Sequence, residues 1–177
     1  MDKKNTLRKK MVAFRAQLVS AEKKEWDQVI CQRIYQLIKD KEANVVHTFL
    51  PMEEEIDIFP LIKQLLSEGI TIAAPEALSK RRLRNWILHD INELQDGIYG
   101  TQFPANSEEY TGDYDLIIVP GLAFDKERYR LGYGAGYYDT FLAKHPEAFT
   151  VGIAYPFQML EEVPTEAHDV RLDSVIY

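Results

Sequence analysis

Two N-terminal segments carry apolar residues at helical spacing. The first runs from about residue 4 to residue 18 and places these residues on one face: Leu7, Met11, Phe14 and Leu18. Its other faces are basic and include Arg15. The second follows Ser20, the predicted N-cap, and its apolar stripe contains Trp26, Ile30, Ile34, Leu37 and Ile38. Both segments are therefore predicted to be amphipathic helices that pack one face against a core.

Short apolar runs predict strands farther along the chain. They are expected at 45–50, 70–74, 83–89, 115–119, 149–155 and 173–176. Between the first two runs, Asp57 is the predicted cap of a third helix that ends near Gly69, and a further helix is expected near 136–144. Residues 92–114 are rich in turn formers and are predicted to be loop. Because strands alternate with helices and lack polar alternation, the pattern predicts an α/β fold with a largely parallel sheet.

Length and composition indicate one soluble domain spanning residues 1–177. The chain has 46% hydrophobic and 28% charged residues, and it contains no internal repeat or linker. Its 21 basic and 28 acidic residues give a net charge of −7, which argues against a nucleic-acid binder. A single cysteine, Cys31, and the absence of a signal peptide or membrane-spanning run indicate a cytoplasmic protein with no membrane partner.

The stretch 130–139, RLGYGAGYYD, is the most informative in the sequence. Gly132, Gly134 and Gly136 alternate, so the backbone can approach a ligand closely and direct several N–H groups at an anion. The stretch is neither a Walker A loop nor a dinucleotide fingerprint, and a tight strand-to-helix turn is the alternative interpretation. Nearby basic residues, Arg130 among them, favour phosphate binding. Asp139 is then either a partner of the helix dipole or an anchor for Mg²⁺.

Two further segments are candidates for ligand binding. Glu53, Glu54 and Glu55 follow a predicted strand, and at least two should face solvent while one turned inward could bind a polar heterocycle. Lys4 and Arg8 share one face of the first helix and could clamp a polyphosphate, although a solvated basic face is the default interpretation. A second basic cluster is interpreted as surface because no glycine loop accompanies it: Lys80, Arg81, Arg82 and Arg84.

Covalent catalysis has little support in the sequence. No serine lies in a nucleophile-elbow context, and Cys31 is predicted to belong to the core. The histidines are dispersed without metal-ligand spacing: His47, His89, His145 and His168.

These elements together resemble the 5-formyltetrahydrofolate cyclo-ligase family, also called methenyltetrahydrofolate synthetase. The resemblance covers essentially the whole chain and rests on K-x-x-x-R at 4–8, LPMEEEID at 50–57, PGLAFD at 120–125, RLGYGAGYYD at 130–139 and HDVRLD near the end. The order of motifs within 120–139 is the most specific part. The resemblance implies a single-domain three-layer α/β/α sandwich.

The resemblance also implies a reaction. Such enzymes use ATP and Mg²⁺ to convert 5-formyltetrahydrofolate into 5,10-methenyltetrahydrofolate, ADP and phosphate. The formyl oxygen attacks the γ-phosphate, a neighbouring folate nitrogen closes the ring, and phosphate leaves. This chemistry needs positioning and charge neutralisation rather than a protein nucleophile. The expected partners are therefore small molecules, bound by a monomer.

Site residues follow from the same resemblance. The expected ATP-binding residues are Lys4, Asn5, Thr6, Leu7, Arg8, Arg130, Leu131, Gly132, Tyr133, Gly134, Ala135, Gly136, Tyr137 and Tyr138. The expected substrate-binding residues are Arg8, Leu50, Glu55, Tyr133, Gly134, Ala135, Gly136 and Tyr137. Lys4, Arg8 and Arg130 are the expected catalytic residues, and Asp139 and Asp169 the expected magnesium ligands. The family often has a basic residue where Tyr133 or Ala135 stands, so Lys4, Arg8 and Arg130 are expected to supply the positive charge.

Two other classes of function fit the same sequence. One is a different nucleotide-dependent enzyme on this scaffold, such as a kinase. The other is a non-catalytic module that binds nucleotide or folate. Release of free phosphate would disfavour the kinase, and tight binding without turnover would favour the module.

Overall fold

A six-stranded sheet forms the centre of the molecule. The computed structural model describes residues 3–177 and contains four α-helices: α1 (Lys3–Ala16), α2 (Ser20–Asp40), α3 (Phe59–Ser67) and α4 (Tyr137–Leu142). The sheet strands are β1 (Val45–His47), β2 (Thr71–Ala77), β3 (Leu83–Ile87), β6 (Leu116–Val119), β9 (Phe149–Ile153) and β11 (Ser174–Ile176). Their order is β11-β9-β6-β1-β2-β3, and every neighbouring pair is parallel except the β2–β3 hairpin. The predicted α/β class with a largely parallel sheet is confirmed.

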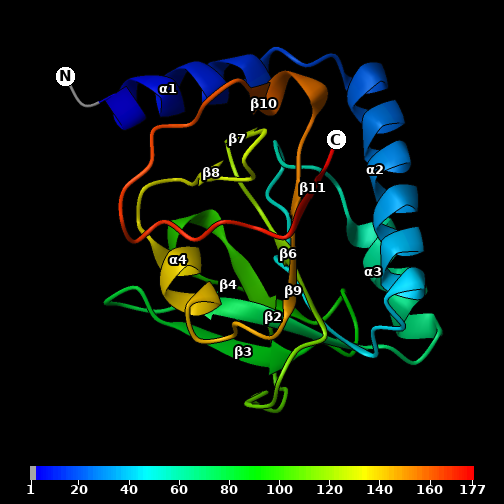
Figure 1. Cartoon of the computed structure of the whole chain (residues 1–177). Coiled ribbons are helices and arrows are strands. Elements are labelled where there is room, and N and C mark those ends of the chain that lie inside the picture. The colour runs from blue at the N-terminus through cyan, green and yellow to red at the C-terminus, as the bar shows by residue number, and fades with distance from the viewer. Residues whose placement is uncertain (1–2) are drawn as a thin grey trace.

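Helices cover the sheet on both faces (Figure 1). The buried isoleucines of α2, Ile30, Ile34 and Ile38, pack with α3 against one face. The other face is covered by α4, whose Phe141 and Leu142 are buried there. Both faces of β6 are consequently apolar, because neighbouring side chains of a strand point to opposite faces. Each fully buried isoleucine contributes about 1.5–3 kcal/mol to this packing. The layers are those of an α/β/α sandwich.

Two small sheets extend the domain beyond the sandwich. One joins β7 (Ala123–Asp125), β8 (Arg130–Leu131) and β10 (Met159–Leu160), and α1 packs on it through Met11. The other pairs β4 (Leu94–Asp96) with β5 (Gln102–Pro104), with a short 3₁₀ turn, η1 (Ile98–Gly100), between them. A second 3₁₀ turn, η2 (Pro156–Gln158), precedes β10. None of the helices within residues 3–177 has the length and apolar character needed to cross a membrane.

The PGLAFD motif builds the joint between the two sheet systems. Phe124 is fully buried, and a Cβ atom at Gly121 or Gly152 would lie 2.6 or 2.5 Å from its ring. Asp125 accepts hydrogen bonds from the backbone N–H groups of Tyr129 and Val163, each at 2.9 Å. The motif therefore holds β7 and β8 in place and positions the stretch that follows them.

Several local expectations differ from the structure. Strands end earlier than predicted at His47, Ile87 and Ile153, and the expected loop 92–114 contains β4, η1 and β5. The helix near 136–144 spans only Tyr137–Leu142. Val19, not Ser20, is the N-cap of α2, and Ile58 is the N-cap of α3. Asp57 still accepts a hydrogen bond from the Phe59 N–H at 3.0 Å, and Gly69 adopts the expected left-handed conformation after α3.

The first helix departs most from its predicted face. Phe14 is 44% exposed, whereas Arg15, placed on the polar face by the sequence pattern, is only 8% exposed. The reason is hydrogen bonding to segments distant in the sequence, because Arg15 Nε donates to the Glu54 carbonyl at 2.9 Å and Nη1 donates to the Tyr133 hydroxyl at 2.8 Å. Arg15, and not Phe14, thus attaches α1 to the loop after β1.

Candidate active site

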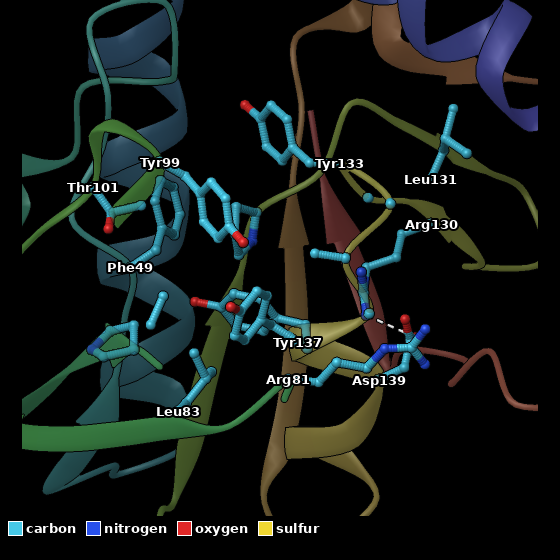
Figure 2. A pocket seen from close by; sticks show the side chains of 18 of the residues that line it. Phe49, Arg81, Leu83, Tyr99, Thr101, Arg130, Leu131, Tyr133, Tyr137 and Asp139 are labelled. Atoms are coloured by element: carbon cyan, nitrogen blue, oxygen red, sulfur yellow. Dashed lines mark hydrogen bonds and ion pairs between the residues drawn. The ribbon is translucent and has the colours of Figure 1, made fainter. Parts of the chain in front are cut away.

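A cavity of about 800 Å³ opens at the carboxyl ends of β1, β2 and β6 (Figure 2). This is the edge where open α/β sheets bind ligands. Phe49, Leu50 and Pro75 line its apolar part. The stretch 130–139, the first turns of α1 and the segment 166–169 supply its polar part.

Each alternating glycine of the 132–136 loop lies against a different arginine. A Cβ atom at Gly132 would lie 3.0 Å from Arg130 Nη1, and one at Gly134 would lie 3.0 Å from Arg8 Cζ. A Cβ atom at Gly136 would lie 3.5 Å from Arg81 Nη1. Gly134 and Gly136 also have positive φ angles of 106° and 70°. The glycines therefore bring three guanidinium groups onto one short loop.

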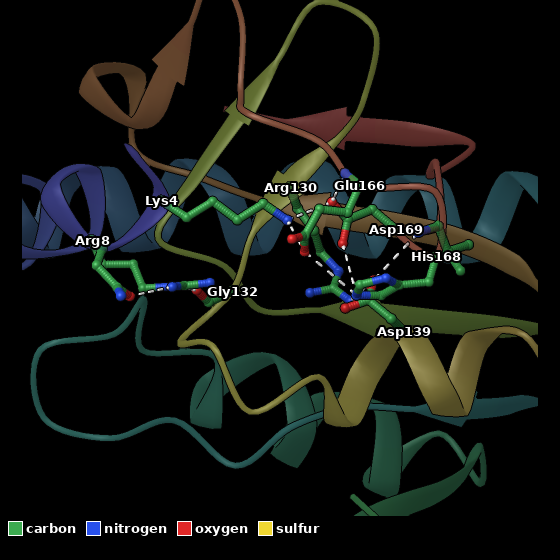
Figure 3. A network of polar contacts seen from close by, with 10 residues as sticks. Lys4, Arg8, Arg130, Gly132, Asp139, Glu166, His168 and Asp169 are labelled. Atoms are coloured by element: carbon green, nitrogen blue, oxygen red, sulfur yellow. Dashed lines mark hydrogen bonds and ion pairs between the residues drawn. The ribbon is translucent and has the colours of Figure 1, made fainter. Parts of the chain in front are cut away.

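Arg8 is held in place by neutral oxygen atoms. Its Nε donates to the Gly132 carbonyl at 2.9 Å, and its Nη1 donates to Asn5 Oδ1 at 2.6 Å. Arg8 spans α1 and the glycine loop, two segments that are far apart in the sequence (Figure 3). No carboxylate among the described residues forms an ion pair with it, so its charge remains available to an anion.

Carboxylates pair with two other cations of the cavity, Arg130 and Lys4 (Figure 3). Arg130 Nη2 lies 2.7 Å from Asp139 Oδ1. Lys4 Nζ lies 2.8 Å from Asp169 Oδ2 and 2.9 Å from Glu166 Oε2. Asp169 also accepts a hydrogen bond from the Glu166 N–H at 2.8 Å, and Asp139 accepts one from the Val170 N–H at 3.3 Å. The expected magnesium ligands are thus paired with two of the expected catalytic cations, Lys4 and Arg130.

Burial and pairing act in opposite directions on the pKa values of this network. Burial alone would lower the pKa of Lys4, but its hydrogen bonds to Asp169 and Glu166 outweigh burial and raise it. Burial would raise the pKa of Asp169, but the Lys4 hydrogen bond and the Glu166 N–H lower it. Burial lowers the pKa of Arg130, against the opposing charge of Asp139. Lys4 and Asp169 are consequently held in their charged forms at neutral pH.

Glu55 is the inward-facing member of the glutamate triplet. It is 7% exposed, whereas Glu53 and Glu54 are exposed. The Glu55 N–H donates to the Met52 carbonyl at 2.9 Å, and the Met52 N–H donates to Glu55 Oε2 at 3.0 Å. This turn directs the carboxylate toward the cavity, where Glu55 Oε1 accepts a hydrogen bond from the Tyr133 hydroxyl at 2.8 Å.

Most of the expected site residues line the same cavity. These residues are Lys4, Arg8, Leu50, Glu55, Asp139, Asp169 and every residue from Arg130 to Tyr138. Asn5, Thr6 and Leu7 do not line it. Asn5 instead supports Arg8, and Leu7 packs against the apolar cluster around Met11. These two residues therefore hold α1 and its cation in place.

An arginine, a glutamate and a histidine that the sequence interpretation does not place in the site also line the cavity. Arg81 comes from the β2–β3 turn and is exposed, as the sequence interpretation expects, but it also lines the cavity, while Glu166 and His168 closely precede Asp169. Arg81 reaches the cavity through the positive φ angles of Lys80 and Arg81. Neither residue is a glycine, so the sequence does not signal this conformation. His168 lies in the HDVRLD motif, and this position is its only sequence signal.

The described carboxylates offer oxygen ligands suited to Mg²⁺. Glu166, His168 and Asp169 place ligand atoms within 4.8 Å of one another, although the sequence spacing of the histidines indicates no metal site. Asp139 adds a further carboxylate to the cavity wall. Carboxylate oxygens beside a phosphate are the usual protein ligands of Mg²⁺, so the donor chemistry fits this ion.

Cys31 does not belong to this site. It is only partly buried, and its Sγ lies 3.4 Å from the Asp57 carbonyl oxygen between α2 and α3. Burial, with the charges of Asp27 and Asp57, raises the pKa of its thiol to about 11. The thiol is therefore protonated at neutral pH, which agrees with a site that works without a cysteine nucleophile.

Comparison with known proteins gives a consistent result. The family model described as the 5-formyltetrahydrofolate cyclo-ligase family matches residues 1–177. The chain is 30% identical to the 5-formyltetrahydrofolate cyclo-ligase of Mycoplasma genitalium, covering 98% of this chain and 96% of that one. It is 26% identical to the Haemophilus influenzae protein of the same name, covering 98% and 97%. The solved structure of Aquifex aeolicus 5,10-methenyltetrahydrofolate synthetase is similar with a TM-score of 0.84 and 31% identity, covering 97% of this chain and 88% of that one.

Proposed function

The chain belongs to the 5-formyltetrahydrofolate cyclo-ligase family, and we propose that it converts 5-formyltetrahydrofolate into 5,10-methenyltetrahydrofolate with ATP and Mg²⁺. ADP and phosphate are the other products. The observation that carries this proposal is the single cavity in which the glycine–arginine loop, the paired carboxylates and the inward-facing Glu55 meet.

The two ends of the cavity suit two different ligands. Arg8, Arg130 and Lys4 gather beside the glycine loop, where backbone flexibility and positive charge favour a polyphosphate. Glu55 lies with Leu50 and Phe49 at a part of the cavity with an apolar wall. A carboxylate beside apolar side chains is suited to the N–H groups of a flat heterocycle such as a folate ring.

The reaction then needs two steps. The formyl oxygen attacks the γ-phosphorus of ATP, the bond from that phosphorus to the bridging oxygen of ADP breaks, and a phosphorylated formyl intermediate forms. The neighbouring folate nitrogen attacks the formyl carbon and loses its proton to the departing phosphate, the carbon–oxygen bond breaks, and phosphate leaves with that oxygen. Arg8 stabilises the negative charge that shifts during phosphoryl transfer, because its own charge is not neutralised by a carboxylate.

Asp139 and Asp169 would hold the magnesium ion. The ion would neutralise phosphate charge, as it does in other phosphoryl-transfer enzymes. Lys4 and Arg130 pair with these carboxylates and keep them oriented toward the cavity. We further propose that the protein is cytoplasmic and acts as a monomer, since residues of one chain supply the expected contacts to both ligands and its single cysteine cannot form an internal disulfide.

A single assay tests the proposal. Purified protein is mixed with 5-formyltetrahydrofolate, and the absorbance of the methenyl product is followed with and without ATP and Mg²⁺ together. We expect product only when both are present, with one ADP and one free phosphate per cyclised folate. A stable phosphorylated product would indicate a kinase. Tight binding of both ligands without turnover would indicate a binding module. Cyclisation at the same rate without nucleotide would also refute the proposal.

A further inference from the structure

We propose that Arg81, on the turn between β2 and β3, binds the phosphates of the nucleotide from the side of the cavity opposite α1. The inference rests on the proposed function, because it assumes that the 132–136 loop holds the phosphates of ATP. It makes the β2–β3 hairpin part of the phosphate site, whereas the interpretation from sequence treats the basic residues of this hairpin only as surface.

The position of the Arg81 side chain is the first argument. A Cβ atom at Gly136 would lie 3.5 Å from Arg81 Cδ and Nη1 and 3.6 Å from its Cζ. The side chain therefore rests directly on the glycine backbone. In Figure 2 it extends across the cavity from the β2–β3 turn toward the residues that begin α4. Its contact with Gly136 repeats the contacts of Arg130 with Gly132 and of Arg8 with Gly134.

The charge of Arg81 is the second argument. Within residues 3–177, its guanidinium makes no ion pair with a carboxylate, whereas Arg130 and Lys4 do. Positions 133 and 135 of the loop are Tyr133 and Ala135, which carry no positive charge. Arg81 and Arg8 are thus the arginines of the described cavity wall whose charge no carboxylate neutralises. An unneutralised guanidinium against a glycine-rich loop is suited to a multiply charged oxyanion.

The hairpin is held in the position that this role requires. The Tyr137 hydroxyl donates a hydrogen bond to the Leu78 carbonyl at 2.7 Å and so ties the turn to the residue that follows Gly136. The Leu78 N–H donates to the Arg82 carbonyl at 2.9 Å and closes the turn. Lys80 and Arg81 have φ angles of 59° and 58°, a left-handed conformation that is unfavourable for residues with side chains. The surrounding contacts thus maintain a strained turn that directs Arg81 inward.

A carboxylate of the folate is the alternative oxyanion. We favour the phosphates because Gly136 and Arg81 line the cavity together with Arg130 and Asp139, the cation and the expected magnesium ligand. Glu55, the expected contact of the folate ring, lies beyond Tyr133 at the other end of the same loop. The two sources of negative charge are distinguished by which ligand loses affinity when Arg81 is removed.

The test compares Arg81→Ala and Arg81→Lys with Arg82→Ala. Arg82 is an exposed neighbour that does not line the cavity, so its substitution is the matched control. Calorimetry measures the affinity for a non-hydrolysable ATP analogue, and steady-state kinetics give the KM values for ATP and for 5-formyltetrahydrofolate. Thermal midpoints report on folding.

We expect Arg81→Ala to weaken binding of the ATP analogue by roughly tenfold or more, the loss typical of a charged hydrogen bond. The KM for the folate and the thermal midpoint should stay close to those of the wild type. Arg81→Lys should retain part of the affinity because it keeps the charge but not the forked donors. Arg82→Ala should bind the analogue as the wild type does.

Three results would overturn the inference in different ways. Equal analogue binding by Arg81→Ala and Arg82→Ala, with wild-type turnover intact, would refute the role of Arg81 alone. A loss confined to the KM for the folate would assign Arg81 to the folate carboxylate. Failure of the wild type itself to bind the analogue would refute the proposed function and the assignment with it.

Discussion

The hydroxyl of Tyr133 donates a hydrogen bond to Glu55 Oε1 at 2.8 Å. This contact joins the glycine loop to the loop after β1, and Arg15 adds a hydrogen bond to the same hydroxyl from α1. Burial and the negative charge of Glu55 raise the pKa of Tyr133, so the hydroxyl remains a neutral donor at neutral pH. The side of the cavity proposed for the nucleotide and the side proposed for the folate are therefore linked through the phenol of Tyr133.

Glu55→Gln should weaken folate binding and leave the affinity for ATP unchanged. The glutamine can still accept the Tyr133 hydrogen bond, but it loses the charge that would strengthen contacts to folate N–H groups. A lost charge-assisted hydrogen bond costs about 1.5–3 kcal/mol, which is roughly a tenfold or greater loss of affinity. Calorimetry with 5-formyltetrahydrofolate and with an ATP analogue measures both affinities. Glu53→Gln is the control because Glu53 is exposed, and equal small effects of the two substitutions would contradict the role of Glu55.

Arg8→Ala should reduce kcat/KM by on the order of 100-fold, the effect of removing one preorganised donor from a transition state. Its Nε and Nη1 are held by Gly132 and Asn5, so the charge is already oriented before a ligand arrives. Lys9→Ala is the control, because Lys9 is exposed on another face of α1 and does not line the cavity. Steady-state kinetics measure the effect, and thermal midpoints show whether the fold is intact. Wild-type activity in Arg8→Ala would show that the first helix is only a solvated basic face.

Gly134→Ala should lower activity by displacing Arg8. The added Cβ would lie 3.0 Å from Arg8 Cζ, and the φ angle of 106° is unfavourable for alanine. Gly69→Ala isolates the backbone cost, because Gly69 has a φ angle of 79° and a Cβ atom added there would meet no atom within 4 Å. Both substitutions should cost about 1–2 kcal/mol of stability, measured by urea unfolding. Only Gly134→Ala should also lower kcat/KM, and unchanged kinetics there would dissociate Arg8 from the loop.

Asp169→Asn should remove a pH-dependent part of the stability. The pKa of Asp169 lies below its usual value of 3.8, so its ionised form stabilises the fold above that pH. This contribution is lost as the pH falls through the lowered pKa in the folded state. The thermal midpoint of the wild type should therefore exceed that of Asp169→Asn at pH 7 and approach it as the pH falls through the lowered pKa of the folded state. A difference that does not change with pH would mean that the carboxylate charge is not what Lys4 stabilises.

His47 should make the protein less stable in mild acid. It is fully buried, its ring lies 2.9 Å from Asn85 Oδ1 through Nε2, and burial lowers its pKa from 6.5 to about 3. Between those values the unfolded chain binds a proton that the folded chain does not, so stability falls as the pH falls. The contribution of His47 should be about 2 kcal/mol between pH 7 and pH 5. Urea unfolding of the wild type and His47→Gln measures it, and equal pH slopes would refute it. His145, whose pKa burial also lowers, remains in both proteins.

The apolar pattern predicts the sheet and the helices that pack on it, because the buried positions of each helix or strand recur with one fixed period along the chain. The isoleucines of α2 are buried as their spacing requires. Phe14 is exposed and Arg15 is buried, the reverse of what the helical period predicts. Arg15 is buried because it forms hydrogen bonds to Glu54 and Tyr133, which lie far along the chain. A helical period contains no information about such partners.

The sequence likewise predicts only part of the candidate site. The glycine spacing indicates an anion-binding loop, and the alternation of Gly132, Gly134 and Gly136 proves to match three arginines. The sequence pattern does not predict that Arg81 lies against this loop. Its approach depends on the left-handed conformation of Lys80 and Arg81 in the β2–β3 turn. The choice of Glu55 over its neighbours likewise follows from a hydrogen-bonded turn with Met52 that the triplet itself does not reveal.

The ion pair between Lys4 and Asp169 joins positions separated by 165 residues. Closing so long a loop is entropically costly, and contacts of this kind form late in folding. This wall of the cavity therefore assembles only after residue 169 has been synthesised and has come together with residue 4. The packing of α2 against α3 closes a much shorter loop, whereas the cavity wall that depends on this ion pair is complete only when residues 4 and 169 have met.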